Sequence, residues 1–157
     1  MNDVSERTFI VRKAQRSDAE MLAHFYINNA DYYFNELAQL QEHLLLFLDQ
    51  PAKICLVAVC PLAPSSIIGF ASVDLIMRPR GGTIGYLGEV LVDQSNRRLG
   101  LAKQLIAASL EQAASAGCHR IILHCESKLQ KLYSTLGFQN WDTGMKFDIS
   151  IHQLVES

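Results

Sequence analysis

The sequence predicts a single α/β (α+β) domain in which helices flank a mixed, mostly antiparallel central sheet. Three observations support this prediction. The chain has 157 residues, of which 49% are hydrophobic and 19% charged, so residues 1–157 have the size and balance of one globular domain. Strand-like apolar runs alternate with segments of helical periodicity. A glycine-containing turn at 78–82 separates two long apolar runs, which predicts an antiparallel hairpin.

Charge and cysteine content narrow the class of protein. The formal net charge of −2 gives no reason to expect a nucleic acid or an anionic membrane as partner. The N-terminus lacks the apolar stretch of a secretory signal, and the apolar runs are too short to span a bilayer. The five histidines have no metal-ligand spacing, so we expect no metal. These features predict a cytoplasmic protein whose four cysteines are buried free thiols: Cys55, Cys60, Cys118 and Cys125.

The first half of the chain is expected to place two helices between strands. Ser17 and Glu20 form a Ser-x-x-Glu capping box, which predicts a helix start there. Apolar residues then recur at helical spacing until shortly before Pro51, where a helix must end. The expected elements are a strand at 9–14, a helix from 17 to 29, a helix from 34 to 48 and a strand at 53–60.

The second half is expected to complete the sheet. Gly117 and Gly137 follow helical segments and are predicted to end them. The expected elements are a turn at 61–65, strands at 67–77 and 83–92, a turn at 94–100, a helix from 101, a strand at 120–125, a helix at 128–136 and a last strand at 139–151.

The stretch from Glu89 to Lys103 predicts a phosphate-binding turn. Its pattern is a strand, a polar turn and the first turn of a helix. Gly100 and Ala102 are small enough to let the backbone approach a ligand, and the N–H groups at a helix N-terminus attract phosphate oxygens. Further donors are the cationic side chains of Arg97, Arg98 and Lys103. The alternative is an ordinary strand-to-helix connection with solvated arginines.

This turn resembles that of a known family. The two common nucleotide signatures, Gly-x-x-x-x-Gly-Lys-Ser/Thr and Gly-x-Gly-x-x-Gly, do not occur in it. Residues 97–102 read Arg-Arg-Leu-Gly-Leu-Ala, similar to the Arg/Gln-x-x-Gly-x-Gly/Ala signature of the GNAT acetyltransferase superfamily. Residues 132–138, Leu-Tyr-Ser-Thr-Leu-Gly-Phe, resemble a second family segment. The resemblance implies a GNAT fold that uses acetyl-CoA, with contacts from Leu91, Val92, Arg97, Arg98, Leu99, Gly100, Leu101, Ala102, Lys103 and Tyr133.

Three stretches look most like glucosamine-6-phosphate N-acetyltransferases within that superfamily. They are residues 85–92, 117–128 and 145–148. The resemblance implies transfer of an acetyl group to the amine of glucosamine 6-phosphate, a step of UDP-N-acetylglucosamine synthesis. The chain departs from that subfamily where Gly88 replaces a usual Glu and His124 replaces an acidic residue.

The implied reaction is direct attack of an amine on the acetyl thioester, which needs a base, an oxyanion donor and an acid. Tyr133 is the candidate acid, because a phenol is protonated at neutral pH; its alternative role is packing. Glu89 is a candidate base among apolar neighbours, and His124 is a rival base. Each of these two residues could instead have only a structural role. The backbone N–H groups of Leu91 or Val92 are the implied oxyanion contacts.

The acceptor side needs its own residues. A sugar phosphate requires cations distinct from those of the turn. The implied subfamily is homodimeric with a pocket shared by both chains, so we expect a homodimer in which some of these cations act across the interface. Tyr26, Tyr32 and Tyr33 are placed where family pockets are lined. The acceptor candidates are Arg78, Arg80, Gly88, Glu89, His124 and Lys146, and the cations among them could instead be solvated surface charges.

Two other functions stay open. The same fold could acetylate another small amine, a polyamine or a protein amine, although Gly88 removes a carboxylate that a polyamine would favour. A catalytically silent acetyl-CoA-binding module is the alternative outside the enzymes. The presence of both Tyr133 and Glu89 favours an enzyme.

Overall fold

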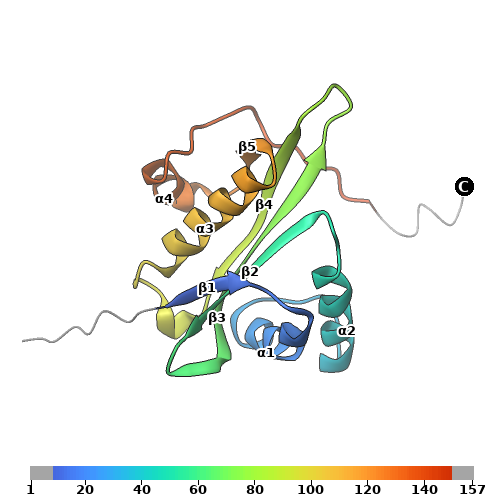
Figure 1. Cartoon of the computed structure of the whole chain (residues 1–157), viewed down its shortest axis with the longest axis vertical. Coiled ribbons are helices and arrows are strands. Elements are labelled where there is room, and N and C mark those ends of the chain that lie inside the picture. The colour runs from blue at the N-terminus through green and yellow to red at the C-terminus, as the bar shows by residue number, and fades with distance from the viewer. Residues whose placement is uncertain (1–8, 150–157) are drawn as a thin grey trace, which may run out of the picture. The chain divides into compact units, whose positions relative to one another are not determined.

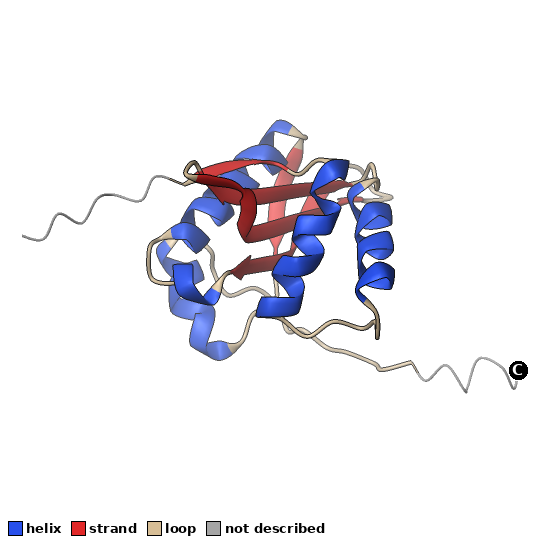
Figure 2. Cartoon of the chain, turned by 90° about the horizontal axis from the view of Figure 1, so that it is seen from below, coloured by secondary structure: helices blue, strands red, loops and turns tan. Residues whose placement is uncertain are grey.

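The computed structural model describes residues 9–149, in two units that meet in sequence between Leu123 and His124 (Figure 1). The first unit contains a sheet and helices on both of its faces (Figure 2). Its elements are β1 Ile10–Lys13, η1 Arg16–Asp18, α1 Ala19–Asn29, α2 Leu37–Leu48, β2 Lys53–Cys60, β3 Ala63–Met77, β4 Thr83–Val92, η2 Gln94–Asn96, α3 Leu101–Ser115 and β5 Cys118–Ile122. The second unit contains η3 Ser127–Leu129 and α4 Gln130–Thr135.

The strands follow one another in the order β1-β2-β3-β4-β5. The first four pair antiparallel with their neighbours, whereas β4 and β5 pair parallel. The mixed, mostly antiparallel sheet predicted from the sequence is therefore confirmed. The hairpin between β3 and β4 is also confirmed, because the Arg78 N–H donates to the Gly82 carbonyl oxygen at 2.9 Å.

The two faces of the sheet carry separate apolar clusters. Val57 and Phe70 point to the face covered by α1 and α2, whereas Leu56 and Ala71 point to the face covered by α3. This is the alternation that the period of two in a strand requires. The strands β2, β3 and β4 are thus covered on both sides, which explains why their sequences read as continuous apolar runs.

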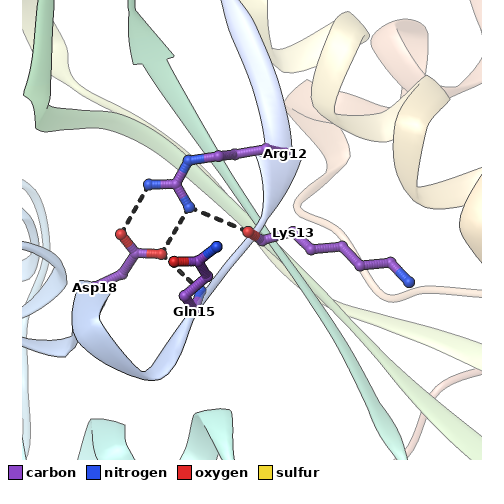
Figure 3. A network of polar contacts seen from close by, with 4 residues as sticks. All are labelled: Arg12, Lys13, Gln15 and Asp18. Carbon is purple, nitrogen blue, oxygen red and sulfur yellow. Dashed lines mark hydrogen bonds and ion pairs between the residues drawn. The ribbon is translucent and has the colours of Figure 1, made fainter.

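The start of α1 differs from the prediction (Figure 3). Ser17 lies inside the short helix η1, so the expected Ser17–Glu20 capping box does not form. A capping box between Gln15 and Asp18 forms at η1 instead. The buried Asp18 carboxylate accepts the Gln15 N–H at 2.6 Å and two bonds from the Arg12 guanidinium, each at 2.8 Å. The Arg12 pair and the Gln15 amide hold the pKa of Asp18 below its usual value.

Three predicted boundaries in the sheet and its helices need correction. The second helix begins at Leu37, because Glu36 before it is extended. Strand β3 begins at Ala63 rather than 67, since Ala63 pairs with Cys60 and shortens the expected turn. Strand β5 spans Cys118–Ile122 rather than 120–125, because its pairing with β4 ends at Ile122.

Within the described part of the second unit, the last strand predicted at 139–151 does not form. Residues 139–149 are irregular, and 150–151 lie outside the described residues. Alternating apolar residues indicate a strand only if another strand supplies hydrogen-bond partners. Met145 and Phe147 are 94% and 86% exposed in this structure, so no such pairing buries them here. The predicted end of the preceding helix is confirmed: Gly137 has φ +95° and the Phe138 N–H reaches the Tyr133 carbonyl oxygen.

The cysteine prediction holds in part. All four thiols are free, but three are only half-buried and Cys125 is exposed. Burial raises the pKa of Cys55 to about 11. Within residues 9–149, no group of three or more His, Cys, Asp or Glu side chains is arranged to hold a metal ion. No helix in that range combines the length and apolar character needed to cross a membrane.

Candidate active site

The candidate site begins where β4 and β5 separate. Their pairing runs from Thr83 opposite Cys118 to Tyr86 opposite Ile122, and β4 then continues to Val92 without β5. Over Leu87–Val92, β4 keeps β3 as a neighbour on one side only. We call the other side of this stretch the open edge of β4. Backbone amides on such an edge are available to a ligand.

One backbone hydrogen bond settles which amides face the open edge. The Asp93 N–H donates to the Ile68 carbonyl oxygen of β3 at 2.8 Å. Because successive residues of a strand turn their polar groups to opposite sides, Leu91 also faces β3, and Val92 and Val90 face the open edge. The Arg97 Nε supports this, because it donates to the Val92 carbonyl oxygen from that side at 3.3 Å. Of the two amides expected from the sequence, the geometry favours Val92, and it adds Val90.

A β-bulge decides where the Glu89 side chain points. Ser72 pairs with Glu89 and the next residue, Val73, pairs with Leu87, so Gly88 is an extra residue in β4. Without the bulge, Leu87 and Glu89 would share the face of α3. The extra residue shifts Glu89 to the face of Ser72, which is covered by α1. Bulges commonly redirect a side chain beside an active site in this way.

Helix α1 contacts Glu89 through Tyr26. The Tyr26 hydroxyl donates to the Glu89 Oε2 at 3.1 Å. The Tyr26 ring lies edge-on to Phe25 and Phe70, with ring centroids 5.8 and 6.0 Å apart. Burial, the charge of Glu89 and the hydrogen bond raise the pKa of Tyr26 well above its ordinary value. The hydroxyl therefore remains a donor through the physiological pH range.

The turn after β4 is held by the Asp93 carboxylate. It accepts hydrogen bonds from the Ser95 N–H and hydroxyl and from the side-chain amides of Asn96 and Asn29. These donors lower the pKa of Asp93, the Ser95 hydroxyl contributing most. Asn29, at the end of α1, also accepts the Gln94 N–H at 3.1 Å. The turn is thereby fastened both to itself and to α1.

The predicted phosphate site lies at the start of α3. Gly100 precedes the helix in a left-handed conformation, with φ +77°, and no side chain caps the N-terminus. A Cβ added at Gly100 would meet no atom within 4 Å, so the space beside it is open to a ligand. Leu101 is buried in the core, and only its backbone could serve a ligand. Three cationic side chains, Arg97, Arg98 and Lys103, are exposed around this turn.

The acceptor candidates of the first unit do not gather at one place. Arg78 and Arg80 lie in the hairpin that precedes β4, whereas Glu89 lies six residues along the strand from Thr83, about 20 Å away. Tyr32 and Tyr33 are exposed, and of the three predicted tyrosines it is Tyr26 that donates to Glu89. The binding roles of Arg78 and Arg80 stay predictions.

Three further candidates belong to the second unit. Tyr133, on α4, packs edge-on against Phe138 at 5.6 Å, and burial raises its pKa. The His124 ring lies so close to Gly144 that a Cβ there would come within 2.6 Å of it. Lys146 is exposed and pairs with Asp148 at 2.9 Å. The catalytic and binding roles expected of His124, Tyr133 and Lys146 stay predictions.

Some features of the site were not found from the sequence. The bulge at Gly88 and the tie between Tyr26 and Glu89 depend on strand register and helix placement, for which the sequence carries no local signal. Asn29 had a weak signal, because an Asn at the end of a helix commonly bonds to neighbouring backbone.

The sheet in which β4 and β5 separate after Tyr86, followed by the uncapped N-terminus of α3, can be compared with known proteins. Residues 20–138 match the model of the acetyltransferase (GNAT) family. The chain belongs to this family.

Relatives within the family are named for one activity. The chain is 36% identical over 94 residues to a glucosamine 6-phosphate N-acetyltransferase of Trypanosoma brucei brucei, covering 57% of this chain and 63% of the relative. It is 30% identical over 117 residues to glucosamine 6-phosphate N-acetyltransferase 1 of Oryza sativa subsp. japonica, covering 73% and 66%. The matched region spans between about half and two thirds of the curated relatives.

Solved structures confirm the fold. An acetyltransferase of Trypanosoma brucei aligns with a TM-score of 0.74 at 25% identity, covering 90% of this chain and all of that one. A glucosamine-6-phosphate N-acetyltransferase of Arabidopsis thaliana aligns with a TM-score of 0.77 at 19% identity, covering 91% and 99%. An aminoglycoside N-acetyltransferase in complex with CoA aligns at 0.73, with 19% identity and coverage of 90% and 95%.

Proposed function

We propose that this chain is an N-acetyltransferase that moves the acetyl group of acetyl-CoA to the amine of glucosamine 6-phosphate. Membership of the GNAT family and the relatives named for that activity support the proposal. The observation that supports it most is that the open edge of β4 and the uncapped N-terminus of α3 lie close together in the chain. Val90 and Gly100 are only ten residues apart. Together they supply donors for the pyrophosphate and for the pantetheine and thioester of an acyl-CoA.

The chain fits acetyl-CoA at three points. The open space beside Gly100 and the first-turn N–H groups of α3 suit the pyrophosphate. The exposed cations Arg97, Arg98 and Lys103 surround that place. The amides of Val90 and Val92 suit the pantetheine and the thioester oxygen. When bound, acetyl-CoA supplies an activated acetyl group.

The residues of the chain then divide the reaction between them. Glu89 takes the proton that the attacking amine loses, directly or through a water molecule. The Val92 N–H stabilises the negative charge that develops on the thioester oxygen. Tyr133 donates a proton to the departing thiolate, and its raised pKa keeps that proton available at neutral pH. His124 remains the alternative base.

The proposal has wider parts that rest on the relatives and the sequence resemblance. Residues 1–157 form a single catalytic domain, and the protein acts as a homodimer in the cytoplasm. Its product feeds the synthesis of UDP-N-acetylglucosamine. The exposed Arg78, Arg80 and Lys146 are the candidate phosphate ligands, one or more of them acting on the pocket of the other copy.

The test measures the release of free CoA from acetyl-CoA with three acceptors in parallel: glucosamine 6-phosphate, glucosamine and spermidine. Rapid release with the sugar phosphate alone supports the proposal. Activity with another amine would keep the acetyltransferase and replace the acceptor. Silence with all three, together with measurable CoA binding, would leave either an acceptor outside these three or the non-catalytic binding module.

A further inference from the structure

Tyr26 is placed to control the orientation of the candidate base. Its hydroxyl donates to only one oxygen of Glu89, Oε2, at 3.1 Å. A carboxylate held through one oxygen keeps the lone pairs of the other for a proton. Glu89 is half-buried and lies on a strand, so its side chain would otherwise choose among several rotamers.

The Tyr26 ring is itself held in place. Phe25 comes from the same helix and Phe70 from strand β3, and both rings contact Tyr26 edge-on. The bulge at Gly88 brings Glu89 onto this face of the sheet. Three separate elements, α1, β3 and the bulged part of β4, therefore converge on one hydrogen bond.

The neighbouring ionisable groups leave that bond intact near neutral pH. Cys55 of β2 lies close enough to raise the pKa of Tyr26, but its own pKa is raised to about 11, so the thiol is neutral. Lys53 of β2 and Asp74 of β3 form an ion pair with each other. Asp93, at the end of β4, is engaged by the turn.

We propose that Tyr26 is a positioning residue that holds Glu89 in the orientation in which its second oxygen accepts the proton of the amine. This inference rests on the proposed function, in which Glu89 is the base. Loss of the hydroxyl therefore releases the Glu89 side chain from this orientation.

The test replaces Tyr26 by Phe, which keeps the ring and removes the hydroxyl. We expect kcat to fall about 10-fold and the KM for acetyl-CoA to stay unchanged. A parallel loss of kcat and of acetyl-CoA affinity would reduce Tyr26 to a packing residue and overturn the inference.

Asn29→Ala is the matched contrast. Asn29 lies one turn further along α1. Its side chain bonds to Asp93 and Gln94, in the turn after β4, and not to Glu89. This variant should raise the KM for acetyl-CoA and leave kcat nearly unchanged. If Asn29→Ala lowers kcat as Tyr26→Phe does, the effect belongs to the helix as a whole and the inference is wrong.

Two further measurements separate this inference from the proposed function. In a Glu89→Gln background, Tyr26→Phe should cause no further loss of kcat, because the group it positions is gone. A Glu89→Gln enzyme as active as the wild type would refute the base instead. Without any turnover, ¹³C NMR of the Glu89 side-chain carboxyl still reads the bond. Its chemical shift at neutral pH should differ between the wild type and Tyr26→Phe, and an unchanged chemical shift would overturn the inference.

Discussion

The two ends of strand β4 differ in how their backbones are paired. At the Val92 end, the strand leaves β5, passes the bulge at Gly88 and enters a turn fixed by the Asp93 carboxylate. At the Thr83 end, the strand pairs on both sides and emerges from a hairpin. The hairpin turn is closed by backbone hydrogen bonds from the Arg78 N–H to the Gly82 oxygen and from the Gly81 N–H to the Arg78 oxygen. Each end has at least one glycine at positive φ and a pair of arginines.

The difference teaches that composition alone does not define a site. Arginines and positive-φ glycines occur at both ends, but only the Val92 end combines them with open backbone amides and a helix N-terminus. A ligand is held by groups that lack other partners and converge on one point. The hairpin end of one chain has the charges of Arg78 and Arg80, but it has no open backbone amides or helix N-terminus directed to the same point.

The largest expected effect comes from Glu89, at the Val92 end. Glu89→Gln removes a proton acceptor but keeps the size and polarity of the side chain. We expect kcat to fall about 1,000-fold with the affinity for acetyl-CoA preserved. Steady-state kinetics and calorimetric titration with acetyl-CoA check this. Glu111→Gln, an exposed change on α3, should have no effect; near-normal kcat in Glu89→Gln would transfer the role of base to His124.

Gly100→Val compares the two ends directly. Gly100 and Gly81 both have positive φ and open space where a Cβ would stand, so valine costs each about 1–2 kcal/mol of backbone strain. Only at Gly100 should valine exclude the pyrophosphate, weakening acetyl-CoA binding about 100-fold through two lost charge-assisted hydrogen bonds.

Calorimetry with acetyl-CoA and thermal unfolding of both variants make the comparison. Equal loss of binding in Gly81→Val and Gly100→Val would mean that strain, and not exclusion of the ligand, is responsible. Unchanged affinity in Gly100→Val would move the phosphate site away from α3.

Tyr133→Phe tests a residue outside β4. We expect kcat to fall about 30-fold, less than for Glu89, because a thiolate is a good leaving group even without an acid. Burial raises the pKa of Tyr133, so the phenol keeps its proton to higher pH than an ordinary tyrosine. In the wild type, kcat should therefore show no loss from this group up to about pH 9. A parallel loss of CoA affinity and kcat in the variant would instead indicate packing.

The smallest expected effects come from the two arginine pairs. Arg97→Ala with Arg98→Ala should raise the KM for acetyl-CoA about 3- to 10-fold, because exposed charges contribute little each. Arg78→Ala with Arg80→Ala should raise the KM for glucosamine 6-phosphate by a similar factor and leave acetyl-CoA unaffected. Identical effects of the two double variants on both substrates would remove the distinction between the ends of β4.

Local signals in the sequence predicted most of the elements correctly. Glycine-containing turns, helical periodicity and apolar runs gave the hairpin, the ends of helices at Gly117 and Gly137, and the antiparallel character of the sheet. These signals failed where the formation of a strand depends on a neighbouring strand. Residues 139–149 have the alternation of a strand but are irregular, because alternation does not supply hydrogen-bond partners.

The sequence by itself determined the family, and it predicted a phosphate site in the turn that leads into α3. Residues 97–102 carry a contiguous pattern whose chemistry, small residues at a helix start, is local to the chain. The tertiary structure decided the face on which Glu89 points, the amides that face the open edge, and the hydrogen bond from Tyr26. These depend on strand register and on the docking of α1, where residues 63 positions apart meet. A one-residue bulge reverses the face of a side chain, and no local pattern records it.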